Sequence, residues 1–139
     1  MKTFVVGDIH GRRAQFAGLL KSLPRDAASD TLVFLGDLID RGPDAPGVVS
    51  DVIELYNDDP ERVVVIRGNH EQMMLDFIDE DSRLWLSPAT GGEETFQQYT
   101  ATSLQAEAEE DQDPPIAAQE SPPRIPQVII SGYPLIQDR

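Results

Sequence analysis

The amino-acid sequence predicts an α/β fold in which parallel strands alternate with crossover helices. Three short runs in the first seventy residues, 4–6, 33–35 and 64–66, have the length and the β-branched or aromatic content of buried strands. Each run is followed at once, or after one residue, by a glycine that lets the backbone turn sharply. The spacing between the runs leaves room for one helical crossover, as neighbouring parallel strands require.

The first crossover helix is indicated by apolar residues at helical spacing between the first two strands. Phe16, Leu19, Leu20 and Leu23 recur at i, i+3, i+4 and i+7, and Pro24 closes the pattern. We therefore expect an amphipathic helix that lays this stripe on the sheet.

A second helix is expected to begin after Asp44, which is suited to the N-cap position. Pro46 is tolerated in a first helical turn, and residues 57–60 end the pattern. The expected buried face consists of Val48, Val49, Val52, Ile53 and Tyr56. This helix would connect the second strand to the third.

A third helix is expected to start near Glu71. Its buried face is predicted to contain Met74, Phe77 and Ile78, with Met73 and Leu75 broadening the apolar surface. Beyond Asp79 the pattern weakens, and residues 84–86 and 96–99 indicate short helices separated by Gly91-Gly92.

The C-terminal part of the sequence has a different composition. Residues 104–124 are acidic and rich in proline, so we expect them to be disordered or loosely ordered. The predicted organisation is a folded domain over residues 1–103, this acidic segment, and a tail over residues 125–139 that forms a strand or a truncated helix.

Charge and composition exclude several classes of function. The 139 residues carry a net charge of −14, with 11 Lys and Arg against 25 Asp and Glu, which argues against nucleic acid as a partner. The absence of cysteine excludes a disulfide, a thiolate nucleophile and a Cys-ligated zinc site. No apolar run is long enough for a signal peptide or a membrane span, so we expect a soluble cytoplasmic protein with no membrane partner.

Polar motifs follow the three expected strands. They read GDIHG at residues 7–11, GDLIDRG at 36–42 and RGNHE at 67–71, and both histidines of the chain lie in them. Because the carboxyl ends of parallel strands share one edge of a sheet, these side chains should meet there. A mixed set of Asp, His and Asn suits divalent manganese, iron or zinc. Two such ions would generate hydroxide and bind the oxygens of a phosphoryl group during in-line displacement.

At these motifs the chain resembles the phosphoprotein phosphatase (PPP-type) family of dinuclear metallophosphoesterases, in its bacterial and phage branch. The resemblance covers about the first hundred residues and implies an incomplete calcineurin-like metallophosphoesterase fold, with the metal site at the C-terminal ends of the strands. It implies two divalent metal ions, with manganese favoured. By this resemblance Asp8 and His10 bind the first ion, Asp37 bridges both ions, and Asn69 binds the second.

The resemblance also implies roles for four further residues. His70 would be the general acid for the leaving alkoxide, oriented by Asp40, as a carboxylate commonly orients an imidazole. Arg41, together with Asn69, would bind the phosphate oxygens of the substrate. Glu71 is expected to support the loop.

The sequence departs from the family pattern after the third motif. The family completes its second metal site with two later histidines, and no histidine follows His70 here. We therefore expect a chain truncated at its C-terminus with an incomplete second metal site. The missing ligands leave open whether this chain is active as an enzyme.

Three functions remain open from the sequence. The first is hydrolysis of phosphomonoesters by attack of a metal-bridging hydroxide, with phosphoserine or phosphothreonine in proteins, or a small phosphoester, as substrate. The second is a catalytically impaired phosphatase-like module that binds metal or a partner. The third is hydrolysis of dinucleoside polyphosphates, although the resemblance implies that Asp40 and Glu71 favour the protein phosphatase branch.

Overall fold

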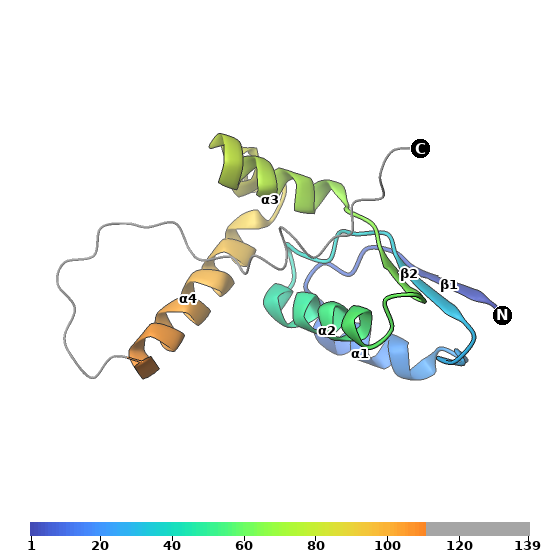
Figure 1. Cartoon of the computed structure of the whole chain (residues 1–139). Helices are drawn as coiled ribbons and strands as arrows, with labels where there is room; N and C mark the ends of the chain where they lie inside the picture. The colour runs from blue at the N-terminus through green and yellow to red at the C-terminus, as the bar shows by residue number, and fades with distance from the viewer. Residues whose placement is uncertain (111–139) are drawn as a thin grey trace.

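A three-stranded parallel sheet forms the centre of the fold (Figure 1). The computed structural model describes residues 1–110, and the side chains of residues 1–101. The strands β1 (Thr3–Val6), β2 (Thr31–Phe34) and β3 (Val63–Val65) lie in that order, with Val6 beside Phe34 and Phe34 beside Val65. The parallel α/β arrangement is confirmed.

Two strands end one residue earlier than expected. Leu35 and Ile66 follow β2 and β3 rather than belonging to them, and both side chains are exposed. Val5 of β1 is exposed as well, whereas Val6, Phe34 and Val65 are buried. The alternation along the strands thus buries one face of the sheet, as the twofold period of a strand requires.

Helices α1 (Arg13–Ser22) and α2 (Ala45–Asp58) lie side by side along one side of the sheet (Figure 1). Phe16 of α1 packs edge-on against Phe34 of β2, with ring centroids 5.7 Å apart. Leu19, expected on the buried stripe, is exposed instead, because α1 turns only a narrow face to the sheet. For α2, the Asp44 side chain accepts a hydrogen bond from the Gly47 N–H, as expected of the N-cap.

The remaining helices form the other end of the molecule. Helix α3 (Asn69–Glu80) starts two residues before the expected position and buries Met74 and Leu75, whereas Ile78 is exposed, contrary to prediction. A short 3-10 helix, η1 (Arg83–Leu86), and helix α4 (Gly92–Glu110) follow. Figure 1 shows α3 apart from the α1–α2 pair, whereas α4 packs against α2.

Helix α4 corrects one expectation about the acidic segment. Its backbone continues to Glu110, so residues 104–110 are helical rather than loosely ordered. A run of Ala, Glu and Gln between residues 105 and 110 explains this, because these are strong helix formers. The rest of the acidic segment and the tail at 125–139 lie outside the described residues.

The loops after β2 and β3 touch at two glycines. Gly36 has a φ of +93°, and a Cβ atom there would lie 2.1 Å from the backbone nitrogen of Gly68. Only glycine permits this conformation and this approach. The contact brings the second and third sequence motifs together. Among residues 1–110, none of the helices has the length and apolar character needed to cross a bilayer.

Candidate active site

The loops that leave the carboxyl ends of the strands have an unusual backbone. His10, Asp37, Asp40 and Arg41 all adopt positive φ angles, of 47°, 50°, 71° and 66°. In the described part of the chain, Asp81 is the one further non-glycine residue in this region. Such conformations cost energy in L-residues and persist where surrounding contacts enforce them, typically at functional sites. The strained backbone conformations therefore occur at residues that the sequence predicts to bind metal, substrate or the catalytic histidine.

Three of the motif side chains converge. Ligand atoms of His10, Asp37 and His70 all lie within 4.8 Å of one another. The His10 Nδ1 atom lies 2.8 Å from the backbone carbonyl of Ile39. Because a carbonyl only accepts, Nδ1 carries the proton and Nε2 keeps its lone pair. Metal-binding histidines are commonly held in this way, so the donor set fits a divalent ion.

Asp8 and Asn69, the other two predicted ligands, border this cluster. The Asp8 carboxylate is 67% exposed and lies 3.8 Å from the His10 Nε2 atom. Asn69 is the first residue of α3 and is exposed, directly before His70. Both stand at the carboxyl ends of their strands, and their roles as ligands remain predictions.

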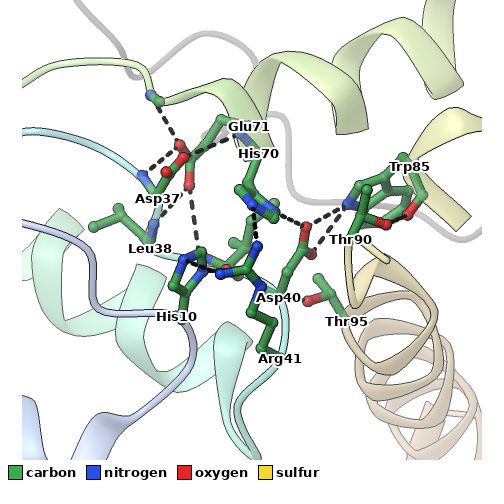
Figure 2. A network of polar contacts seen from close by, with 12 residues as sticks. His10, Asp37, Leu38, Asp40, Arg41, His70, Glu71, Trp85, Thr90 and Thr95 are labelled. Carbon is green, nitrogen blue, oxygen red and sulfur yellow. Dashed lines mark hydrogen bonds and ion pairs between the residues drawn. The ribbon is translucent and has the colours of Figure 1, made fainter. Parts of the chain in front are cut away.

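His70, itself a member of this cluster, forms a buried pair with Asp40 (Figure 2). The His70 Nδ1 atom lies 2.6 Å from an Asp40 carboxylate oxygen, and the side chains are 4% and 0% exposed. The backbone N–H of His70 donates to the Asp37 carboxylate at 3.0 Å. These contacts fix the imidazole at the start of α3 with its Nε2 atom toward His10, whose ring centroid lies 4.8 Å away.

Arg41 spans the two imidazoles. One guanidinium nitrogen lies 3.1 Å from the His10 Nε2 atom, and the other lies 3.2 Å from the His70 Nε2 atom. A guanidinium only donates, so both Nε2 atoms act as acceptors in this arrangement. Arg41 is exposed on its other side. A planar cationic fork thus stands against the cluster, with a geometry that suits the oxygens of an anionic group.

Glu71 ties the two loops together below the cluster. One of its carboxylate oxygens accepts from the backbone N–H groups of Asp37 and Gly68, at 2.8 and 2.9 Å. The other accepts from Leu38 and Ile39, at 2.8 and 3.4 Å. Glu71 is 1% exposed. Backbone dipoles thereby compensate its buried charge, which agrees with the supporting role expected of it.

Two residues of the network were not singled out by sequence analysis. The Trp85 indole N–H lies 3.0 Å from each Asp40 carboxylate oxygen, and the Thr95 hydroxyl accepts from the Asp40 backbone N–H at 2.9 Å. Both side chains are fully buried. The one available signal was that a buried tryptophan normally finds an acceptor for its N–H, but the sequence does not say which acceptor.

Tyr99 of α4 is a titratable residue whose side chain is buried in the core. Burial raises the pKa of its phenol well above the usual value, and the carboxylates of Asp44 and Glu71 raise it further. The phenol therefore stays protonated and does not act as a base at neutral pH.

Comparisons with known proteins agree with this geometry. Residues 1–124 match the family model for calcineurin-like phosphoesterases. The chain is 41% identical over 107 residues to serine/threonine-protein phosphatase 1 of Salmonella typhimurium, covering 76% of this chain and 45% of the relative. It is 38% identical over 94 residues to serine/threonine-protein phosphatase 2 of Escherichia coli, covering 67% of this chain and 39% of that protein.

A second group of relatives carries a different name. The symmetrical bis(5'-nucleosyl)-tetraphosphatase of Proteus mirabilis is 35% identical over 83 residues, covering 60% of this chain and 29% of the relative. A Saccharomyces cerevisiae serine/threonine phosphatase similar to human PP5 shares the fold, with a TM-score of 0.50 and 23% identity over 70% of this chain and 32% of its own.

The matches cover only part of each relative's length. The chain spans less than half the length of the curated relatives named above. The family itself rests on a match over most of the chain and on the three motifs at the ends of β1, β2 and β3. The chain belongs to the calcineurin-like phosphoesterase family.

Proposed function

We propose that this chain carries the phosphoryl-transfer site of a metal-dependent serine/threonine protein phosphatase. One observation carries the proposal: the buried His70–Asp40 pair adjoins His10 and Asp37, with Arg41 in contact with the Nε2 atoms of both imidazoles. A module that only binds metal has no need for an oriented imidazole. A hydrolase needs one to protonate the leaving oxygen.

The predicted ligands Asp8, His10, Asp37 and Asn69 would hold the metal. Divalent ions at such a site supply a nucleophilic water at neutral pH and stabilise charge on phosphoryl oxygens, with manganese our first choice and iron or zinc as alternatives. The set of carboxylates, one imidazole and one amide suits ions of this type.

The side chains of the chain itself bind the phosphate and move the proton. Arg41 would transfer its two hydrogen bonds from the imidazoles to the phosphoryl oxygens when substrate arrives. This exchange frees the Nε2 atom of His70 to take up a proton from solvent, which makes the ring an imidazolium paired with Asp40. As the bond between phosphorus and the leaving oxygen breaks, His70 gives that proton to the oxygen, and Asp40 holds the Nδ1–H throughout.

The choice between protein and dinucleotide substrates rests on two residues. Relatives of this chain carry both names. Asp40, which orients His70, and Glu71, which holds the loops, are the residues that favour the protein phosphatase branch by the family pattern. We therefore propose phosphoserine or phosphothreonine in a protein as substrate, with a small phosphoester as an accessory one.

The proposal is tested by turnover with manganese present. Phosphate release is measured from a phosphoserine peptide, from p-nitrophenyl phosphate and from diadenosine tetraphosphate. We expect release from the first two, lost in His70→Asn and Asp37→Asn but kept in Asp51→Asn, whose carboxylate pairs with Arg13 outside the site. Turnover of the dinucleotide alone would reassign the substrate. Manganese binding without turnover of any substrate would favour the binding module.

A further inference from the structure

Trp85 makes the contact that completes the surroundings of Asp40. In the described part of the chain, the donor to the Asp40 Oδ1 atom is the Trp85 indole N–H, at 3.0 Å. The Oδ2 atom is shared between the same indole, at 3.0 Å, and His70, at 2.6 Å. Asp40 and Trp85 are both 0% exposed, so water does not replace either contact.

The indole is itself held firmly. Its ring packs against Phe77 of α3, with centroids 5.5 Å apart and planes tilted by 49°. At the start of α4 a Cβ atom on Gly92 would lie 2.6 Å from the indole nitrogen, so the chain leaves room for the ring by having glycine there. The Thr90 hydroxyl donates to the Trp85 backbone carbonyl. The turn from η1 into α4 therefore encloses the indole and aims it at Asp40 (Figure 2).

The two polar contacts from this region fix different parts of Asp40. Thr95 accepts from the Asp40 backbone N–H and so holds the main chain, which has a φ of 71°. Trp85 touches the carboxylate itself. Of the contacts that the described residues make with the carboxylate, the one with His70 would remain without this N–H, and it alone would not fix rotation about the bond to the Cβ atom.

We propose that Trp85 is a positioning residue for His70, acting through Asp40. By bonding both carboxylate oxygens, Trp85 holds the carboxylate plane in the orientation that keeps the proton on His70 Nδ1 and aims Nε2 at the cluster. The catalytic consequence rests on the proposed function. The structural consequence does not, and the experiment separates the two.

The structural test uses the two histidines of the chain as reporter and internal control. Nitrogen-15 spectra, at a pH where both imidazoles are neutral, distinguish the Nδ1–H from the Nε2–H tautomer. We expect Trp85→Phe to move His70 toward a mixture of tautomers and to leave His10 unchanged, because His10 is held by the Ile39 carbonyl. Phe77→Leu disturbs the same packing but keeps the N–H, and is expected to leave both histidines unchanged. An unchanged His70 in Trp85→Phe overturns the proposal.

The wild-type protein gives a second structural reading if Trp85→Phe does not fold. The chain has one tryptophan, so its indole N–H gives a single resonance. We expect slow exchange with solvent and a shift of this resonance in Asp40→Asn but not in Asp51→Asn. An indole that exchanges as fast as an exposed one overturns the proposal.

The catalytic consequence is tested with leaving groups of different basicity. A poor leaving group such as phenol needs a proton from His70 more than p-nitrophenol does. We expect Trp85→Phe to lower kcat about tenfold for phenyl phosphate and much less for p-nitrophenyl phosphate, with KM nearly unchanged. Equal losses on both esters overturn the catalytic part. If the wild-type chain has no turnover, the proposed function fails, and the spectra still decide the role of Trp85.

Discussion

The two sides of the site differ in how firmly they are held. On the β1 side, the Asp8 carboxylate is 67% exposed, and the His10 side chain contacts the Ile39 carbonyl and the exposed Arg41. On the other side, Asp40 of the loop after β2 and His70 and Glu71 of α3 are buried and make several hydrogen bonds each. The difference shows that the residues proposed to move a proton are fixed by the interior, whereas a ligand proposed for the ion stands open to solvent.

This contrast has an energetic meaning. A buried polar network stabilises the fold only while every member is paired, since an orphaned donor or acceptor keeps its full desolvation cost. An exposed carboxylate can be removed with little effect, because water replaces its partner. Substitutions on the two sides should therefore divide into those that lower stability and those that change ion binding alone.

The largest loss of stability is expected for Glu71→Gln. The amide NH2 group would face backbone N–H donors, which leaves at least two of them without an acceptor. We expect unfolding in urea to show a loss of about 3 kcal/mol. Glu54→Gln, at an exposed position of α2, is the matched control and should stay within about 0.5 kcal/mol of wild type. A Glu71→Gln protein as stable as this control would refute the contrast.

Thr95 offers a finer test on the same buried side. Thr95→Val keeps the shape but leaves the buried Asp40 N–H without its acceptor, for an expected loss of about 2 kcal/mol. Thr95→Ser keeps the hydroxyl and removes a methyl group, for an expected loss of about 0.8 kcal/mol. Chemical denaturation of both variants compares them. Equal stabilities of the two variants would mean that the hydrogen bond from the Asp40 N–H to Thr95 does not contribute to the free energy of unfolding.

Asp8→Asn tests the open side. Because the carboxylate is mostly exposed, we expect the free energy of unfolding to change by no more than about 0.5 kcal/mol. We expect affinity for manganese to fall about tenfold or more, since a charged ligand is replaced by a neutral one. Calorimetry of unfolding and of metal binding measures the two effects on one sample. A loss of stability with unchanged affinity for manganese would mean that Asp8 supports the fold and does not bind the ion.

The smallest effect is expected far from the site, at Asp30, whose carboxylate accepts from backbone N–H groups as Glu71 does. The N–H of Asp26, and then that of Lys2, lower the pKa of this carboxyl. A lowered native pKa adds stability above the unfolded pKa, and this stability is lost as the pH falls through the native pKa.

Asp30→Asn should therefore be less stable than wild type near neutral pH. The gap should begin to close below the ordinary pKa of an aspartate and should close fully only as the pH falls through the lower native pKa of Asp30. Urea unfolding along a pH series measures it. A gap that stays constant with pH would show that the carboxylate charge contributes nothing there.

The features that could be predicted from the sequence are those that depend on local residue patterns. The three strands, the Asp44 cap and the order of helices follow from periodicity and turn residues, and the motifs at the strand ends follow from parallel topology. Leu19 and Ile78 were misplaced because a stripe at helical spacing does not reveal how wide the contact with the sheet is.

The contacts from η1 and α4 to Asp40 were beyond sequence reasoning for another reason. Trp85 and Thr95 lie 45 and 55 residues from Asp40, and no local pattern states which buried acceptor an indole will meet. The positive φ angles of Asp40 and Arg41 were equally hidden, since neither is glycine. Strain of this kind is imposed by the tertiary structure and becomes visible only there.

The central claim is that His10 and Asp37 meet to bind a divalent ion. Calorimetric titration of manganese into the whole chain tests it most directly, with His10→Ala and Asp37→Asn beside the control Asp51→Asn. We predict saturable binding to wild type and to the control, and a loss of at least about tenfold in affinity in both site variants. Binding that is equally strong in all four proteins would contradict the account.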